Sequence, residues 1–140
     1  MLNFIDVVKE VLDEQGKSTE VLFSDGVISK DTFYKYRQRD PGLKTVLTIA
    51  NYLKVSVDYL FERNNENVFC CPYVYNAQTF YENLMRYIDC KKVSGRQFSK
   101  DLGYSRDNIA RWKRGVMPTA KNILEIADYF GCQADDLLRG

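Results

Sequence analysis

The segment SRDNIARWKR, residues 105–114, carries side chains suited to hydrogen-bond a nucleic acid. The guanidinium of Arg106 can donate two parallel bonds to guanine, and the amide of Asn108 can pair with adenine. Arg111 lies one helical turn beyond Asp107, where it can reach a base or a phosphate. Asp107 can accept a bond from cytosine, although we favour a role at the helix N-terminus beside the neighbouring arginines.

Basic and polar side chains beside these residues suit phosphate contacts, which fix position without reading sequence. Lys113 and Arg114 close the same segment. Ser94 lies just before the helix that we expect upstream of this segment, and the first backbone amides of that helix favour an anion. Arg96 and Lys100 add positive charge to that helix. A basic run on a helix is usually only a solvated face. Whether these residues form a nucleic-acid interface therefore depends on the helices that position them.

Composition argues against catalysis and metal binding. The chain has no histidine, which is the commonest general acid or base and metal ligand at neutral pH. It also has no Gly-rich phosphate loop, no serine elbow and no carboxylate pair in an apolar setting. The four cysteines, at positions 70, 71, 90 and 132, lack zinc-ligand spacing, although a Cys90–Cys132 disulfide stays open. We therefore expect no catalytic residue, metal, cofactor or small-molecule ligand.

The chain also lacks the signals of a membrane or secreted protein. No run of about 18 apolar residues could span a bilayer. The N-terminal segment MLNFIDVVKEVLDE carries acids where a signal peptide needs a basic end followed by an apolar stretch. We therefore expect a cytoplasmic protein with no membrane partner.

An internal repeat divides the 140 residues into two small domains. The segment IADYFGCQADDLL, residues 126–138, aligns with IANYLKVSVDYLF, residues 49–61, at an offset of 77. Upstream, SRDNIARWKRGVMP aligns with SKDTFYKYRQRDP at an offset of 76. Both copies show apolar residues at helical spacing. The sequence predicts an all-α chain with domains at residues 1–63 and 79–140 and a connector at residues 64–78.

The connector contains NNENVFCCPYVYN, whose asparagines and proline break helical periodicity. Apolar and aromatic side chains follow, so this segment differs from a solvated linker. We expect those side chains to pack against one or both domains: Val68, Phe69, Tyr73, Val74 and Tyr75.

Caps and periodicity predict five short helices in the second copy. We expect Thr79 to open the first, Ser94 with Gln97 to form a capping box for the second, and Ser105 to cap a third that runs through Arg114. A further cap, Thr119, opens the fourth helix, and a final turn covers residues 135–138. The expected core consists of Phe80, Leu84, Tyr87, Ile88, Phe98, Leu102, Ile109, Trp112, Ile123, Leu124, Ile126, Ala127 and Phe130.

This order of helices, with LGYSRDNIARWKRGVMPTAKNILEIADYFGCQADDLL, resembles the lambda-repressor-like helix-turn-helix family of the xenobiotic-response-element type. The resemblance covers residues 93–138 and implies that the third helix lies in the major groove. The family often has a glutamine after the position of Ser94, where this chain has Gly95, so one positioning contact departs from the pattern. The DNA-binding residues that the resemblance implies in this copy are Ser94, Ser105, Arg106, Asp107, Asn108, Arg111, Lys113 and Arg114.

The first copy follows the pattern less closely. Its turn, FSDGVIS, sets Gly26 one residue early and leaves Val27 at the usual glycine position, which is costly if that position is left-handed. Base contact by this copy and a packing or dimerisation role stay equally open. The equivalent reading helix, KDTFYKYRQ, places these side chains toward bases or phosphates: Lys30, Asp31, Thr32, Lys35, Arg37 and Arg39.

Charge favours the second copy as the DNA-binding one. Residues 1–66 hold 9 basic and 11 acidic side chains, a net charge of −2, whereas residues 79–140 hold 11 and 8, a net charge of +3. Binding that depends on phosphate neutralisation should weaken with salt.

We therefore expect a regulator of transcription, a repressor that occupies an operator in double-stranded DNA, of the kind the resemblance places in bacteria and their mobile elements. Either one chain sets both third helices into major-groove segments about 34 Å apart, or the second copy alone reads DNA while the first copy and the connector build a homodimer. We favour the second arrangement. The competing class is a protein-interaction module of the same fold, antitoxin-like or a co-regulator, with weak or no DNA binding.

Overall fold

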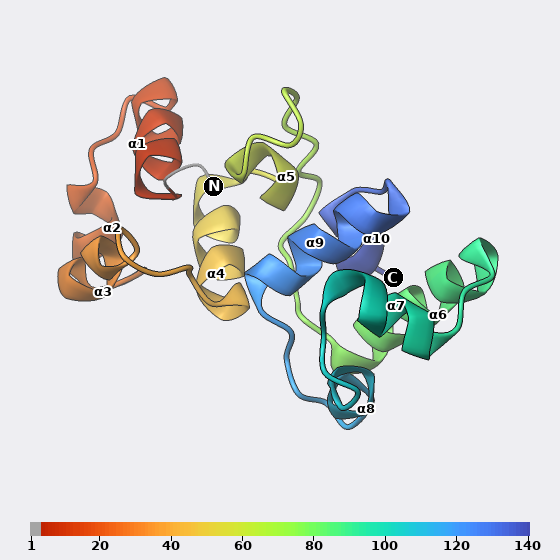
Figure 1. Cartoon of the computed structure of the whole chain (residues 1–140). Coiled ribbons are helices and arrows are strands. Elements are labelled where there is room, and N and C mark those ends of the chain that lie inside the picture. Colours follow the sequence, from red (N-terminus) through yellow and green to blue (C-terminus); the bar gives the residue numbers. More distant parts are fainter. Residues whose placement is uncertain (1–3) are drawn as a thin grey trace. The chain divides into compact units, whose positions relative to one another are not determined.

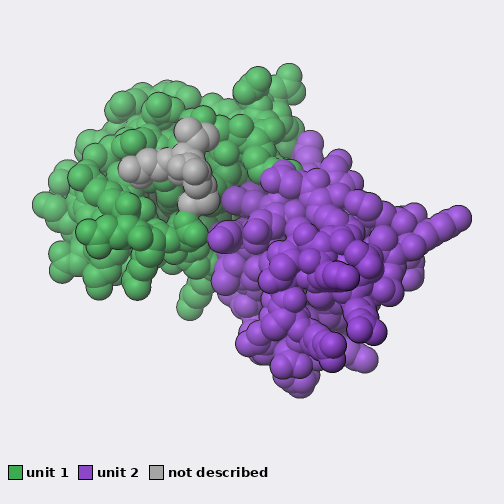
Figure 2. Space-filling model, viewed as in Figure 1, with its two compact units in different colours: residues 1–73 green, residues 74–140 purple. Residues whose placement is uncertain are grey.

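The chain is all-helical, as predicted (Figure 1). The computed structural model describes residues 4–140, and within them it has ten helices and no strand. None of these helices combines the length and apolar character needed to cross a bilayer. The chain divides into two compact units, unit 1 at Met1–Tyr73 and unit 2 at Val74–Gly140 (Figure 2), so the division falls inside the expected connector.

Unit 1 contains helices α1 (Phe4–Glu14), α2 (Glu20–Ser24), α3 (Lys30–Lys35), α4 (Leu43–Leu53) and α5 (Val57–Leu60). Apolar residues at helical spacing in α1 and α4 turn one face of each helix inward, and α5 packs against both. The fully buried side chains at the centre of this unit include Ile5, Leu12, Leu22, Phe33, Ile49, Leu53 and Leu60.

Residues 64–73 of the expected connector are built into unit 1. The amide of Asn51 donates to Tyr73 O at 3.0 Å and accepts from Tyr73 N at 2.6 Å. The Tyr73 hydroxyl accepts from Val57 N at 3.0 Å, and its side chain is buried. Two valines contradict the expectation that they pack, since Val68 is 40% and Val74 81% exposed. The pairing of the Asn51 side chain with the Tyr73 backbone, which spacing alone does not reveal, fixes this segment on unit 1.

The turn between α2 and α3 removes the expected cost at Val27. Gly26 itself takes the left-handed conformation, with φ +71°, and follows the C-cap of α2, Asp25. Val27 N and Ile28 N both donate to Leu22 O, at 3.0 and 3.3 Å. Because glycine supplies the positive φ, no β-branched residue needs it.

Unit 2 contains α6 (Ala77–Lys91), α7 (Gly95–Leu102), α8 (Asn108–Lys113), α9 (Ala120–Phe130) and α10 (Ala134–Leu138). Thr79 does not open α6, because Asn76 caps it and accepts from Thr79 N at 3.1 Å. Thr119 caps α9 as predicted, in a reciprocal box with Asn122. Both caps satisfy amides that have no partner within their helix.

An aromatic group around Phe98 holds α7 and α9 together. The ring of Phe98, which is fully buried, stacks on Phe130 at 5.7 Å and meets Tyr129 and Tyr104 edge-on at 5.5 and 6.1 Å. Among the expected core residues, Tyr87, Leu102, Ile109, Leu124 and Phe130 are only half-buried.

A buried amide that the sequence did not single out ties α6 to the end of the chain. Asn83 is 3% exposed, and its Nδ2 donates to Leu137 O at 3.1 Å and to Arg139 O at 2.9 Å. These bonds satisfy the last carbonyls of α10, which otherwise have no partner in their own helix.

Replacing Lys92 with glycine is expected to stabilise unit 2 by about 1 kcal/mol. Lys92 caps α6 in the left-handed region, at φ 58°, which costs a side-chain-bearing residue roughly 1–2 kcal/mol. Glycine removes that cost and gives back part of it as backbone entropy. Urea unfolding followed by the fluorescence of Trp112, the sole tryptophan of the chain, measures the change. Lys91→Gly, inside α6, should destabilise instead, and a gain there would contradict this reading.

Candidate nucleic-acid interface

Helix α7 presents the first part of the interface. Ser94 caps it by accepting from Gln97 N at 3.0 Å. The expected capping box is only half formed, because the Gln97 side chain donates to Asp101 at 2.6 Å instead of returning to Ser94. Gly103 ends the helix at φ +71° and leads into the turn before α8.

Helix α8 begins at Asn108, two residues after the predicted start. Ser105 is not its side-chain cap, because the Ser105 hydroxyl donates to Asn108 Oδ1 at 3.0 Å. The Arg111 guanidinium donates to Asn108 Oδ1 at 2.7 Å and to Ser105 Oγ at 3.4 Å. Residue Asp107 precedes α8 in a helical conformation and makes no side-chain cap bond. Side-chain pairing has thus displaced the cap that the sequence predicts.

This triad of Ser105, Asn108 and Arg111 constrains how bases can be read. Adenine recognition by asparagine needs both its oxygen and its nitrogen. The Asn108 oxygen already accepts from Ser105 and Arg111, so base contact requires that the bonds be exchanged or shared. The two α8 side chains therefore act as a coupled pair.

The remaining predicted residues of unit 2 lie open to solvent. Arg106 stands in the turn before α8, and Lys113 and Arg114 lie at its C-terminal end. All three are exposed, as is Arg111. The exposed donors of Arg106, Lys113 and Arg114 can meet base edges or phosphates without first losing burial.

Tyr104 packs beneath the turn before α8. Its hydroxyl donates to Glu125 at 3.1 Å, and its ring meets Trp112 edge-on at 5.8 Å. Burial is the main cause that raises the pKa of Tyr104 well above its usual value of 10.0, so the hydroxyl stays protonated. Trp112 is buried as a core anchor, as expected, and its ring also meets Phe80 at 5.6 Å.

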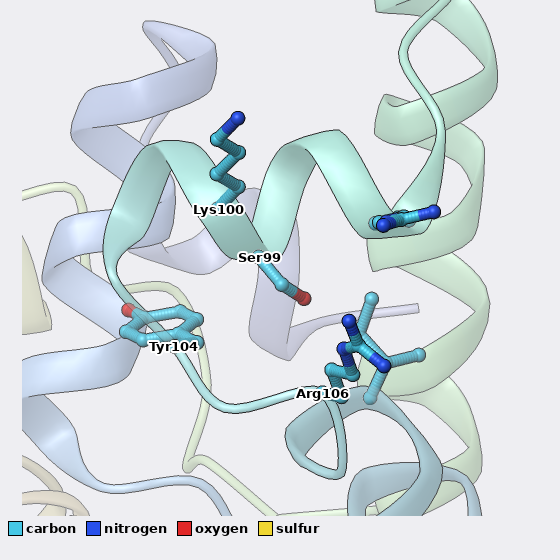
Figure 3. Close-up of a pocket in the computed structure, with 7 residues that line it drawn as sticks. Ser99, Lys100, Tyr104 and Arg106 are labelled. Carbon is cyan, nitrogen blue, oxygen red and sulfur yellow. The ribbon is translucent and has the colours of Figure 1, made fainter.

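A hollow of about 630 Å³ opens between α7 and the turn before α8 (Figure 3). Ile109 lines it, which explains why this residue is half-buried instead of a core anchor. Gly95 also lines it, and a Cβ there would lie 3.2 Å from Ile109 Cδ1. Ser99, which the sequence did not single out, is a further lining residue, and it is a polar group on the buried face of α7. The full lining is Gly95, Arg96, Ser99, Lys100, Tyr104, Arg106 and Ile109.

A hydrogen bond from α9 braces α7 behind the interface. The hydroxyl of Tyr129 donates to Asp101 at 2.6 Å, and Gln97 donates to the same carboxylate. The bond from Tyr129, then that from Gln97, lowers the pKa of Asp101 below its usual value of 3.8. The same bond raises the pKa of Tyr129.

Asp101→Asn is expected to reduce the dependence of the unfolding free energy of unit 2 on pH at acidic pH. A carboxylate whose pKa is lower in the folded state stabilises the fold fully above its usual pKa. That contribution begins to decline below about pH 4 and is lost as the pH falls through the lower folded pKa. Unfolding free energies from Trp112 fluorescence at several pH values test this, with Glu125→Gln as a second acid removal. Identical slopes for Asp101→Asn and the unchanged protein would contradict the expectation.

The predicted residues of unit 1 are divided between exposed cations and one occupied hydroxyl. Lys30, Lys35 and Arg37 are exposed, and Arg37 lies over the ring of Tyr34 at 5.2 Å. Thr32 is half-buried, and its hydroxyl accepts from Ser29 at 2.7 Å. Ser29 also caps α3 through Thr32 N, so α3 begins at Lys30 as predicted. Thr32 thus serves the helix start.

Residues 83–139 match the Cro/C1-type HTH DNA-binding domain. The match begins within α6 and includes α7, α8, α9 and α10, so it covers every predicted site residue of unit 2. Searches of curated proteins and of solved structures found no match to the chain. Unit 2 therefore carries a helix-turn-helix domain of a DNA-binding class.

Proposed function

We propose that the protein is a sequence-specific transcriptional regulator, a repressor, that reads the major groove of double-stranded DNA with α8 of unit 2. The observation that carries the proposal is the coincidence of the Cro/C1-type match with exposed cations on α7, α8 and their connecting turn. Arg106 and the coupled pair Asn108 and Arg111 are the base-reading groups. Ser94, Lys113 and Arg114 contact phosphates, and Asp107 favours the start of α8.

Unit 1 is a second, diverged copy of the same domain. Two contacts recur at repeat-equivalent positions and support this part of the proposal. Phe4 meets Tyr36 edge-on at 5.9 Å, as Phe80 meets Trp112 at 5.6 Å, and both pairs have an interplanar angle of 81°. The hydroxyl of Tyr52 donates to Asp25 at 2.5 Å, as that of Tyr129 donates to Asp101 at 2.6 Å.

Base reading belongs to unit 2 alone in this proposal, and unit 1 forms a homodimer. The net charge of −2 over residues 1–66 opposes a DNA-facing role for unit 1, as does the occupied hydroxyl of Thr32. Tyr73 takes no part in the dimer contact, because unit 1 already buries its side chain. DNA as the partner places the protein in the cytoplasm.

Selection of random duplex DNA by the purified full chain, at two salt concentrations, tests the function. Enrichment of a motif at low salt, weakened at high salt, supports sequence-specific reading. A motif with two unequal half-sites would favour one chain that reads with both units, and two identical half-sites would favour a homodimer. Absence of any enriched motif at low salt would overturn the proposal in favour of a protein-interaction module of the same fold.

A further inference from the structure

We propose that the hollow between α7 and the turn before α8 binds a phosphate group, through Ser99 and the two arginines Arg96 and Arg106. Ser99 is a buried residue of the hollow's lining, and Arg96 and Arg106 are exposed residues of the same lining. None of the seven lining residues is acidic. An oxyanion is therefore the ligand that this set of side chains favours.

Ser99 is the observation that distinguishes a built site from a basic surface. The residue is only 6% exposed, and within residues 4–140 its hydroxyl makes no hydrogen bond. Figure 3 shows this hydroxyl pointing toward the guanidinium of Arg106. A hydroxyl that opens into the hollow beside a cation can donate to an acceptor bound there. A phosphate oxygen between the two groups supplies that acceptor.

The two arginines suit a phosphate ligand better than a point charge such as an ammonium group would. A guanidinium presents parallel donors whose geometry matches two phosphate oxygens. Arg106 comes from the turn and Arg96 from the first turn of α7, so the cations approach from two elements. Lys100 extends away from Arg106 in Figure 3 and belongs to the rim.

Gly95 provides the room. Because it has no side chain, Ile109 approaches so closely that even a Cβ would lie 3.2 Å from Ile109 Cδ1. The remaining volume of about 630 Å³ exceeds that of inorganic phosphate and falls in the range of small-ligand sites. The bound phosphate can therefore belong to a larger molecule.

Two sources share this chemistry, the backbone of DNA and a free phosphorylated compound. The DNA source rests on the proposed function, whereas phosphate binding by the hollow does not.

Titration of the full chain with inorganic phosphate, at ionic strength held constant with sodium chloride, tests the site by two-dimensional amide NMR. We expect saturable shifts of the Gly95 and Ser99 amides. Ser99→Ala removes only the hydroxyl, and Arg96→Ala removes one fork; each should raise the dissociation constant at least about fivefold. Arg86→Ala removes the same charge from α6, outside the hollow, and should change it less than about twofold. Trp112 fluorescence checks that each variant is folded.

Failure to saturate in the unchanged protein would overturn the phosphate site, as would equal weakening by Arg86→Ala and Arg96→Ala. Duplex DNA is then added to the phosphate-loaded chain. If DNA displaces phosphate from the Gly95 and Ser99 amides, the site serves the DNA backbone. If both remain bound, the site serves a free phosphorylated compound. If no duplex binds at all, the proposed function fails while the phosphate result stands.

Discussion

Arg106→Ala is expected to lower the affinity of the full chain for its selected duplex by about 5- to 150-fold, the equivalent of 1–3 kcal/mol. Arg106 is exposed in the turn before α8 and can present its fork to guanine. Its loss should also flatten the preference at one base position. Binding isotherms for the selected duplex and for single-base variants measure both effects.

The charge-conserving variant Arg106→Lys separates base reading from phosphate attraction. Lysine keeps the charge but lacks the planar fork, so it should restore little of the affinity if Arg106 reads a base. Arg86→Ala on α6 serves as a matched control and should leave binding nearly unchanged. Full recovery by lysine, with the base preference intact, would show that Arg106 contacts only the backbone.

Phe98→Ala should destabilise unit 2 by about 3–5 kcal/mol, the range for truncating a buried aromatic ring. The fully buried ring contacts Tyr104, Tyr129 and Phe130 and joins α7 to α9. A domain of this size has a total stability of only several kcal/mol, so the variant should be largely unfolded at 37 °C. Urea unfolding monitored by Trp112 fluorescence reports the loss.

Phe98→Leu keeps most of the volume and should cost less than about 1.5 kcal/mol. It tests whether the effect comes from the cavity. An equal loss in both variants would mean that the edge-on and stacked aromatic contacts, instead of volume, hold α7 to α9. A small loss in Phe98→Ala would mean that unit 2 collapses around the gap.

Local signals predicted the helices whose ends depend on one residue. Thr119 opens α9 as predicted, because a threonine cap acts within one turn of chain. The predicted start of α8 was wrong for a different reason. Serine is a residue type that caps helices, but the Ser105 hydroxyl bonds the side chains of Asn108 and Arg111 instead of a backbone amide of α8. A competition between side chains depends on their directions in space, which residue spacing does not give.

The candidate site was predictable in its charges and not in its shape. Arg106, Arg111, Lys113 and Arg114 were chosen from type and position, and all four are exposed. The hollow depends on the close approach of Gly95 to Ile109, a distance between two helices that periodicity does not encode. The connector shows the same limit, since pairing between Asn51 and Tyr73 joins residues that are 22 positions apart.

The bond between Asn108 and Arg111 has an evolutionary consequence. Each side chain restrains the other before any DNA arrives, so part of the ordering cost of about 0.5–1.5 kcal/mol per side chain is already met. A substitution at Asn108 allows Arg111 to populate many rotamers. A substitution at Arg111 allows the Asn108 amide to rotate. New operator preferences at this helix should therefore arise through paired substitutions, with single changes passing through a regulator of weakened discrimination.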